Sequence, residues 1–142
     1  MYFKPMNTEA EWEWFVKRTF CIRCEDSCGI VAYSSTGQIK AVVGVDSLTQ
    51  VACNIHLAVE SPMVFKYGLL QEASHLVFDV LKRERMFGLV PSTNLKALKL
   101  NRHLGFTQVA EIPDAVADGV GYCILSLEKE DCSWYTKTEE AA

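Results

Sequence analysis

The residues best suited to proton transfer lie in or beside one short apolar stretch, residues 51–59. His56 is the first candidate, because an imidazole titrates close to neutral pH and can take a proton from an amine directly or through water. Asn54 precedes it by two residues and would share its face of a strand. Glu60, at the end of the stretch, is the second candidate base. A strand histidine that is only packed and hydrogen-bonded is the alternative, and the sequence leaves both interpretations open.

Six cysteines raise the question of a disulfide framework or a metal site. The N-terminus has no basic stretch, apolar core or cleavage site of a signal peptide, so an oxidising compartment is not expected. Cys21, Cys24 and Cys28 form a Cys-x-x-Cys-x-x-x-Cys cluster, but zinc needs four ligands and no second paired knuckle is present. We therefore expect free thiols and no metal. The alternative is a fourth ligand supplied through the fold by a histidine or by one of Cys53, Cys123 and Cys132.

The composition describes a chain of 142 residues that can bury the core of one domain. Hydrophobic residues make up 49% and charged residues 23%, which is typical of a globular protein. A net charge of −4 argues against nonspecific binding to nucleic acid, which needs concentrated Lys and Arg. Apolar runs are shorter than the ~20 residues of a membrane span. We expect a single domain over residues 1–142 with a polar tail from about residue 129, no membrane contact and a cytoplasmic location.

Local patterns predict the elements that position these candidates in the first half of the chain. Thr8-Glu9-Ala10-Glu11 fits a capping box, and the apolar residues after it predict a helix over residues 8–20. The polar residues 21–28 predict a turn or a short second helix. Two strands, over residues 29–34 and 38–46, are joined by a Gly-containing turn and predict an antiparallel hairpin.

The second half alternates strands and helices. A strand over residues 51–59 is followed by a helix that begins at Ser61-Pro62 and runs to Leu81. The remaining prediction is a strand over 87–90, a helix from Asn94 closed by Gly105, a strand over 107–112, a loop over 113–119 and a strand over 120–127. This order implies a mixed α/β sheet in which residues 51–90 form a right-handed parallel crossover.

The closing helix carries a resemblance to a known family. Asn94, Ala97 and Leu104-Gly105-Phe106, at this spacing, resemble the final helix of GNAT-type N-acyltransferases. The resemblance implies an α/β (α+β) fold of GNAT type over nearly the whole chain. Its central sheet would be mixed, mostly antiparallel and flanked by helices, with one parallel strand–helix–strand crossover.

A finer resemblance is to small GNAT-like proteins encoded by bacteriophages. It rests on Cys24-Glu25-Asp26 before Gly29-Ile30-Val31-Ala32, the Ile55-His56 strand, Pro62, Phe78 and Glu130-Asp131-Cys132-Ser133-Trp134. It implies a viral protein that works in the cytoplasm of the host.

The resemblance implies a binding site for acetyl-CoA, used as a co-substrate. The strand end Leu57-Ala58-Val59 would present backbone groups to the pantetheine arm, and the turn after it would hold the pyrophosphate. The family pattern there is Arg or Gln, two residues, Gly, one residue, then Gly or Ala; Phe65, Gly68 and Leu70 occupy these positions, and only Gly68 matches. The implied contacts are completed by Lys66, Tyr67, Leu69 and Asn94. Asn94 also suits a plain helix cap.

The resemblance also assigns a place for a general acid. Many members carry a tyrosine four residues before the closing glycine, where its hydroxyl can protonate the departing thiolate; this chain has Asn101. An amide cannot donate a proton in that way, although it can hydrogen-bond the thioester sulfur. Tyr122 and Tyr67 are substitutes in principle. The catalytic candidates are thus His56, Glu60 and Asn101.

The function that the resemblance implies is acetyl-CoA-dependent acetylation of an amine, with an acceptor that the sequence does not identify. Backbone amides near Val59 would stabilise the oxyanion. The acidic net charge favours a basic acceptor by long-range steering. The alternative is a GNAT-shaped binding protein without catalysis, engaging a protein partner through a surface that includes Trp12, Trp14 or Trp134. A homodimer is also compatible with the sequence.

Overall fold

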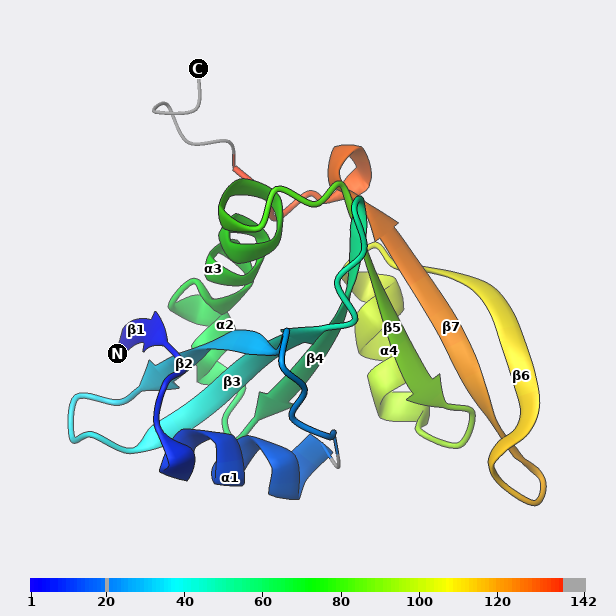
Figure 1. Cartoon of the computed structure of the whole chain (residues 1–142), viewed down its shortest axis with the longest axis horizontal. Coiled ribbons are helices and arrows are strands. Elements are labelled where there is room, and N and C mark those ends of the chain that lie inside the picture. The colour runs from blue at the N-terminus through cyan, green and yellow to red at the C-terminus, as the bar shows by residue number, and fades with distance from the viewer. Residues whose placement is uncertain (20, 137–142) are drawn as a thin grey trace.

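The computed structural model describes residues 1–19 and 21–136. It contains a seven-stranded sheet in the order β1-β2-β3-β4-β5-β7-β6 (Figure 1). All neighbouring strands are antiparallel except β4 and β5, which are parallel. The predicted mixed, mostly antiparallel sheet with one parallel crossover is therefore confirmed. The strands are β1 Tyr2–Pro5, β2 Cys28–Tyr33, β3 Ile39–Asp46, β4 Ala52–Val59, β5 Arg85–Pro91, β6 Thr107–Ala117 and β7 Val120–Glu128.

Helices flank the sheet at the positions that the sequence predicts, with one break. The helices are α1 Glu9–Thr19, α2 Met63–Lys66, α3 Leu69–Ser74 with a π-helical continuation His75–Val80, α4 Leu95–His103 and a 3-10 turn Lys129–Asp131. Phe20, the predicted last residue of the first helix, lies outside the described residues. In the part of the chain that the structure covers, no helix is long and apolar enough to span a membrane.

The single helix predicted from Ser61-Pro62 to Leu81 is divided at Gly68. This residue has φ +97°, a left-handed conformation that glycine adopts without steric cost, and it separates α2 from α3. Apolar periodicity continues across the break, because residues on both sides of it face the same core. The sequence pattern therefore did not reveal it.

The strands also differ from the prediction in two places. β1 was not expected, because four residues that include a proline carry too little pattern to identify an edge strand. The loop predicted over residues 113–119 is wrong: β6 continues to Ala117. Its pairing with β7 shifts between Ile112 and Ala117, and Asp114 has φ +56° within that shift. The turn-forming residues there mark an irregularity inside a long hairpin and not its end.

The first helix is fixed to the sheet by its N-terminal residues. The capping box is confirmed: Glu11 N donates to Thr8 Oγ1 (3.2 Å) and Thr8 N donates to Glu11 Oε1 (3.0 Å). Glu11 is fully buried. Its carboxylate also binds Lys4 Nζ of β1 (2.6 Å) and accepts from the Tyr33 hydroxyl of β2 (2.5 Å). One carboxylate thus joins α1 to two strands.

The faces of the sheet are covered by different helices. Trp12 and Phe15 of α1 share one core cluster with Val42 and Ala58, whereas α3 and α4 belong to the other cluster (Figure 1). Gly44 allows α1 to approach closely, because a Cβ on it would lie 2.3 Å from the Phe15 ring. In the register of the sheet Gly44 lies opposite His56. The α1 face of β4 is therefore the face on which His56 stands.

The C-terminal segment packs against α4. Trp134 is buried, and its Nε1 donates to Leu104 O (2.8 Å). Cys132 is buried as well. The tail predicted to be polar from about residue 129 thus contributes to the core as far as Trp134. Residues 137–142 lie outside the described residues.

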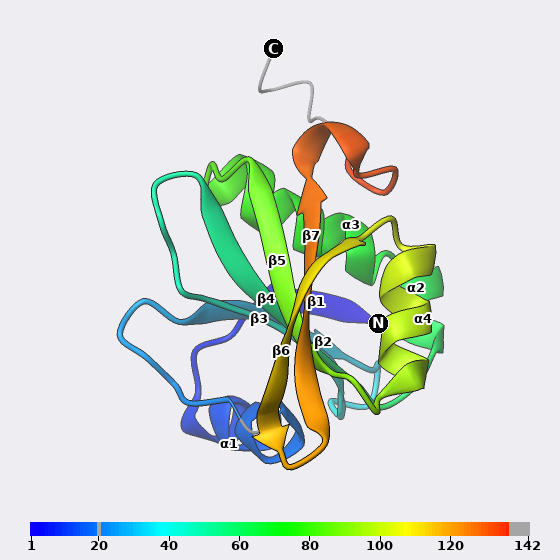
Figure 2. The same cartoon turned by 90° about the vertical axis from the view of Figure 1, so that its right-hand side faces the viewer.

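The parallel strands β4 and β5 separate along their length. Their pairing covers only Ala52↔Arg85, Cys53↔Met86 and Asn54↔Phe87, although β4 continues to Val59 and β5 to Pro91. Figure 1 shows the two strands together at one end and apart at the other. Beyond the gap, β5, β7 and β6 form the second part of the sheet with α4 beside them (Figure 2). This divergence places a cleft in the middle of the sheet.

Candidate active site

A cleft of about 410 Å³ lies where β4 and β5 separate. Its walls come from β4, β5 and α4, with contributions from α1 and α3. Ile55 and Leu57 point to the α3 and α4 face, while His56 points to the α1 face, so the cleft passes through the sheet. The principal lining residues are Thr19, His56, Leu57, Leu70, Asn94 and Asn101.

Backbone groups of β4 face into this cleft. Ile55 O points towards β5, since a Cβ on Gly88 would lie 3.8 Å from it. Along an extended strand, successive residues direct their N–H and C=O groups to opposite neighbours, so Leu57 and Val59 also point away from β3. Glu60 N, which donates to Lys40 O of β3 (2.9 Å), fits this alternation. β5 does not pair with β4 beyond Asn54 in the described chain, which leaves the groups of Leu57 and Val59 for a bound molecule.

His56 stands between a thiol and a carboxylate at the α1 side of the cleft. Its Nε2 lies 2.9 Å from Asp46 Oδ2, at the end of β3, and its Nδ1 lies 3.1 Å from Cys21 Sγ, in the loop after α1. The side chains of His56 and Asp46 are only 19% and 14% exposed. Phe15 packs edge-on against the imidazole at 6.3 Å between ring centroids. The three polar groups therefore form one continuous series in a largely enclosed place.

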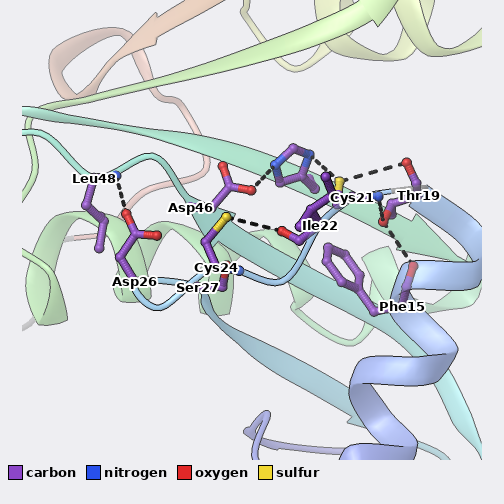
Figure 3. Close-up of polar contacts among 10 residues, drawn as sticks. Phe15, Thr19, Cys21, Ile22, Cys24, Asp26, Ser27, Asp46 and Leu48 are labelled. Atoms are coloured by element: carbon purple, nitrogen blue, oxygen red, sulfur yellow. Dashed lines mark hydrogen bonds and ion pairs between the residues drawn. The ribbon is translucent and has the colours of Figure 1, made fainter.

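The loop that carries Cys21 is tied down on both sides, as Figure 3 shows. Cys21 N donates to Thr19 Oγ1 (3.3 Å) at the end of α1. Further along, Asp26 Oδ2 accepts from Leu48 N of the β3–β4 connection (3.0 Å). Between these ties, Cys24 N donates to Ser27 Oγ (2.8 Å) and closes a turn. These contacts hold the thiol of Cys21 against the imidazole.

The contacts shift the titration of both members of the pair. Burial lowers the pKa of His56, but the hydrogen bonds and negative charges of Cys21 and Asp46 outweigh it and raise that pKa above its usual value. Burial raises the pKa of Cys21, but the hydrogen bonds from His56 and Thr19 dominate and lower it. Burial alone dominates at Cys53 and raises its pKa to about 12. Cys21 thus has a thiolate-favouring environment that a simply buried thiol lacks.

Two buried acceptors near this series have no donor within the described chain. They are Asp46 Oδ1 and Asn54 Oδ1, on residues that lie opposite each other in the β3–β4 register. Asn54 is only 6% exposed. Buried acceptors of this kind are normally satisfied by a water molecule or by N–H groups of a bound molecule.

Four of the predicted site residues line the cleft: His56, Leu57, Asn94 and Asn101. Asn94 is the N-cap of α4, where its side chain accepts from Ala97 N (3.2 Å). Asn101 Nδ2 donates to Ala97 O (2.9 Å), which uses part of its amide inside the helix. Val59 is not among the lining residues, although its backbone groups point away from β3 like those of Leu57.

Other predicted residues lie elsewhere. Glu60 is exposed and pairs with Arg18 (3.3 Å), outside the cleft. Ala58 pairs with Val42 of β3 and is buried under α1. Lys66 and Tyr67 are exposed on the surface beyond β4. Leu69 is fully buried in the core, so it offers only its backbone.

The region of the family's phosphate-binding pattern is partly retained. Gly68 has a left-handed conformation directly before α3, and no heavy atom lies within 3.4 Å of where its Cβ would be. Leu70 lines the cleft with its side chain. Phe65 packs against the core. The glycine thus provides the turn into the helix, while Leu70 narrows the space in front of it.

The sequence did not identify Cys21 and Asp46 as partners of His56. Cys21 had been considered as a metal ligand, yet residues 1–19 and 21–136 contain no group of three or more His, Cys, Asp or Glu side chains suited to a metal ion. The six cysteines are free thiols. The one available signal was the short connection, residues 47–50, between the strands predicted over residues 38–46 and 51–59, which keeps the ends of these two strands close together.

Neither Tyr67 nor Tyr122, the possible substitutes for the family's tyrosine, lines the cleft. The described lining residues contain no tyrosine that could act as the general acid. Tyr67 is 51% exposed, and Tyr122 lies on β7 opposite Pro91. Trp12 and Trp134, which had been considered as anchors for a protein partner, are buried at 6% and 9% exposure. They cannot form a docking surface in this fold.

Comparison with known proteins identifies the fold. No protein-family model and no curated protein sequence matches the chain. Among solved structures it is similar to spermidine/spermine N-acetyltransferase SpeG from Vibrio cholerae, with a TM-score of 0.73 and 10% identity over 89% of this chain and 91% of that chain. It is also similar to N-acetyltransferase PseH from Campylobacter jejuni in complex with acetyl coenzyme A, with a TM-score of 0.60 and 21% identity over 75% and 70% of the two chains.

A third similar structure is the ribosomal-protein-S5-alanine acetyltransferase from Vibrio fischeri, with a TM-score of 0.62 and 14% identity over 75% and 64% of the two chains. Sequence identities this low establish the architecture alone. The mixed sheet with its diverging parallel pair is the GNAT fold, as the resemblance of the closing helix predicted.

Proposed function

We propose that this protein is an acetyl-CoA-dependent N-acetyltransferase that transfers an acetyl group to an amine. The observation that carries the proposal is the cleft between β4 and β5, which has free backbone groups on one wall and an imidazole at its end. The acetyltransferases of the same fold include one in complex with acetyl coenzyme A and one in complex with CoA and spermine, which supports the choice of co-substrate.

The residues present fit a CoA thioester. Leu57 and Val59 offer N–H and C=O groups in the geometry of a strand edge, and the amide chain of the pantetheine arm can pair with such an edge. Gly68 and the start of α3 offer amides to the pyrophosphate, and Lys66 adds a positive charge nearby. Asn94 and Asn101 face the arm from the opposite wall. Leu70 and the missing arginine reduce the affinity that a full phosphate-binding pattern would give.

His56 is the proposed general base. Asp46 holds Nε2–H, so that Nδ1 is the atom that exchanges a proton on the Cys21 side. The amine attacks the thioester carbonyl and loses a proton to the imidazole, while the oxyanion accepts a hydrogen bond from a β4 amide such as Val59 N. The bond to the CoA sulfur then breaks, and the thiolate leaves with the proton that the imidazolium returns. Glu60 is not part of this route, because its carboxylate is exposed and paired with Arg18.

The proposed acceptor is a basic amine. The chain has a net charge of −4, and Asp46 Oδ1 and Asn54 Oδ1 lie buried beside His56 without a donor in the described chain. One enzyme of the same fold is a spermidine/spermine N-acetyltransferase, and a structure of a spermidine N-acetyltransferase holds CoA and spermine. We further propose that the domain covers residues 1–142 and acts in the cytoplasm, in a bacterial host if the gene belongs to a phage.

Titration of the pure protein with acetyl-CoA by calorimetry tests the proposal. Binding with a thermal shift is expected; no heat and no shift at millimolar cofactor contradict it. His56→Ala should lower turnover by on the order of 100-fold while acetyl-CoA affinity changes little. His103→Ala, on the exposed side of α4, is the matched control and should leave both unchanged. Equal turnover of the two variants removes His56 from the mechanism.

A second candidate function is a GNAT-shaped binding protein without catalysis. One observation favours it: β6 is exposed along its whole length, and Val109, Ile112 and Val116 are apolar residues on that exposed strand. A silent acetyl-CoA titration together with recovery of a stoichiometric protein partner, or of a homodimer, supports this candidate. Substituting these three residues by Ser should then abolish the association.

A further inference from the structure

The thiol, imidazole and carboxylate of Cys21, His56 and Asp46 are arranged as in enzymes that use cysteine as a nucleophile. A nucleophilic thiol needs a base within hydrogen-bond reach, and the base needs a third group that orients it. Here the first distance is 3.1 Å, from Sγ to Nδ1, and the second is 2.9 Å, from Nε2 to Oδ2. The series is built from three separate segments of the chain, the loop after α1, β4 and β3.

The protonation of the pair favours a thiolate. The side chains of His56 and Thr19 lower the pKa of Cys21 against the effect of burial, which raises it, while Cys21 and Asp46 raise the pKa of His56. Nε2 of His56 lies against the Asp46 carboxylate, which accepts its proton in a hydrogen bond, and Nδ1 and the Cys21 sulfur share one proton between them. The proton of the thiol is therefore drawn towards the ring.

The position of the pair suits attack on a molecule in the cleft. His56 and Thr19 both line the cleft, and Cys21 contacts both of them. Cys21 itself is partly exposed. Cys21 is not itself a lining residue of the cleft, and its thiol lies next to the α1 end of that space, in contact with two residues that line it.

We propose that Cys21 takes the acetyl group from the thioester and passes it to the amine, so that transfer proceeds in two steps through an S-acetyl enzyme. The proposal rests on the proposed function and replaces the direct attack of the amine on the co-substrate by an attack on the acetyl-cysteine. It assigns Cys21 as the nucleophile, His56 as the group that moves the proton and Asp46 as a positioning residue.

The two steps balance without a further reactant. In the first, the Cys21 thiolate attacks the acetyl carbonyl, the bond to the CoA sulfur breaks, and the His56 imidazolium gives its proton to the departing thiolate. In the second, the amine attacks the acetyl-cysteine, the bond to Sγ breaks, and the now neutral imidazole takes the proton that the amine loses. The product amide leaves, and the thiolate and imidazolium are restored.

This route accounts for a departure of the chain from the family pattern. The closing helix carries Asn101 where a tyrosine acid would stand, and the Asn101 amide already donates to Ala97 O. An imidazolium at His56 supplies the missing acid in the first step. The same ring is the base in the second step, so one residue serves both.

The charged surroundings do not compete for the proton. On β3 the group facing His56 is Asp46, and on the loop after α1 it is Cys21. Arg18 of α1 lines the cleft but is held by Glu60. Among the described lining residues, Arg18 and His56 are the two with titratable side chains, since β5 and α4 contribute none.

The first experiment is intact-mass analysis after mixing the protein with acetyl-CoA in the absence of any amine. We expect a mass increase of one acetyl group, located at Cys21 by peptide mapping and removed by hydroxylamine. Cys21→Ser should abolish the adduct and lower turnover by on the order of 100-fold. Cys24→Ser, on an exposed thiol of the same loop, is the matched control and should retain both.

The second experiment measures thiol reactivity without acetyl-CoA. The rate of alkylation by iodoacetamide at Cys21 should begin to rise at a lower pH than that at Cys24, and His56→Ala should remove this advantage. Far-UV circular dichroism and thermal unfolding confirm that the variants are folded.

The outcomes separate this inference from the function on which it rests. The two-step route is overturned if the protein binds acetyl-CoA and acetylates an amine, no adduct forms, and Cys21→Ser keeps full activity. The proposed acetyltransferase function would then still stand. A protein that does not bind acetyl-CoA overturns both. An adduct on Cys24 in place of Cys21 overturns the assignment of the nucleophile.

Discussion

At the scale of single residues, two enclosed titratable side chains lie in very different surroundings. Glu11 is held ionised by four donors: Lys4, the Tyr33 hydroxyl and two backbone amides. Burial raises its pKa, but these donors together lower the pKa to about 2. His56, in contrast, lies between a thiol and a carboxylate, which together raise its pKa against the effect of burial. Glu11 serves stability and His56 is placed for chemistry, because only His56 borders a cleft.

Glu11→Gln should destabilise the fold in a pH-dependent way. The pKa of Glu11 falls from 4.5 to about 2 on folding, so its stabilising effect is complete above about pH 4.5 and is lost as the pH falls towards 2. The difference in unfolding free energy between wild type and variant should reach about 3 kcal/mol at neutral pH and shrink over that range. Urea unfolding at several pH values measures it.

Thr8→Ala separates the charge of Glu11 from the capping box. Glutamine keeps the box, since its amide can still accept from Thr8 N, whereas alanine at position 8 removes the hydroxyl cap. Thr8→Ala should cost about 1 kcal/mol at every pH. A constant difference for Glu11→Gln across the same pH range would contradict the assignment.

At the scale of elements, the break at Gly68 determines how the chain leaves β4. Without it, the helix predicted to Leu81 would begin at Pro62, about two turns before Leu69, and its amides would point elsewhere. The left-handed glycine instead starts α3 at Leu69, beside the cleft wall formed by Leu70. The start of the helix and the free edge of β4 thereby face the same space.

Gly68→Ala should reduce the free energy of acetyl-CoA binding by more than it reduces the free energy of unfolding. A Cβ at Gly68 meets no atom closer than 3.7 Å, so the cost comes from the backbone and is roughly 1 kcal/mol. Gly37→Ala is the matched control: Gly37 also has a positive φ (+82°) with open space around it, in the β2–β3 turn. Both variants should lose similar stability in thermal unfolding.

Calorimetry then distinguishes the two glycine variants. We expect reduced acetyl-CoA affinity for Gly68→Ala and unchanged affinity for Gly37→Ala. Equal affinities would mean that the start of α3 does not contact the pyrophosphate.

At the scale of the whole molecule, the C-terminal segment joins the two parts of the sheet. Trp134 contacts α4 through Leu104 O and lines the cleft, and Tyr135 donates to Asp79 Oδ1 at the end of the π-helical turn (2.6 Å). α4 belongs to the second part of the sheet, whereas the π-helical turn follows α3 on the first part. Trp134 and Tyr135 therefore support the wall of the cleft across the gap between β4 and β5.

Trp134→Ala should destabilise the protein by about 3–5 kcal/mol, the usual cost of removing a buried tryptophan side chain. It should also weaken acetyl-CoA binding, because α4 loses its support. Val80→Ala, at a position that is 59% exposed, should change stability by only about 0.5 kcal/mol. Urea unfolding measures the change in stability, and calorimetry measures the change in acetyl-CoA binding. If Trp134→Ala leaves the stability unchanged, the C-terminal segment is not part of the core.

Local signals in the sequence determined the order of the elements, and with it the fold. The capping box at Thr8 and Glu11 and the cap at Asn94 are formed as predicted. Gly105, with φ +103°, closes α4 as predicted, with Phe106 N donating to Asn101 O (3.0 Å). Each of these depends on residues within a few positions of one another, so their spacing alone is sufficient evidence.

The tertiary structure alone decided which residues meet at the site. His56 meets Cys21 and Asp46, which are 35 and 10 positions away, because β3 and β4 pair in one register and Asp26 ties the Cys21 loop to their connection. The cleft exists because β4 and β5 stop pairing at Asn54. Pairing registers and strand divergence are set by packing over the whole core, which no local spacing records.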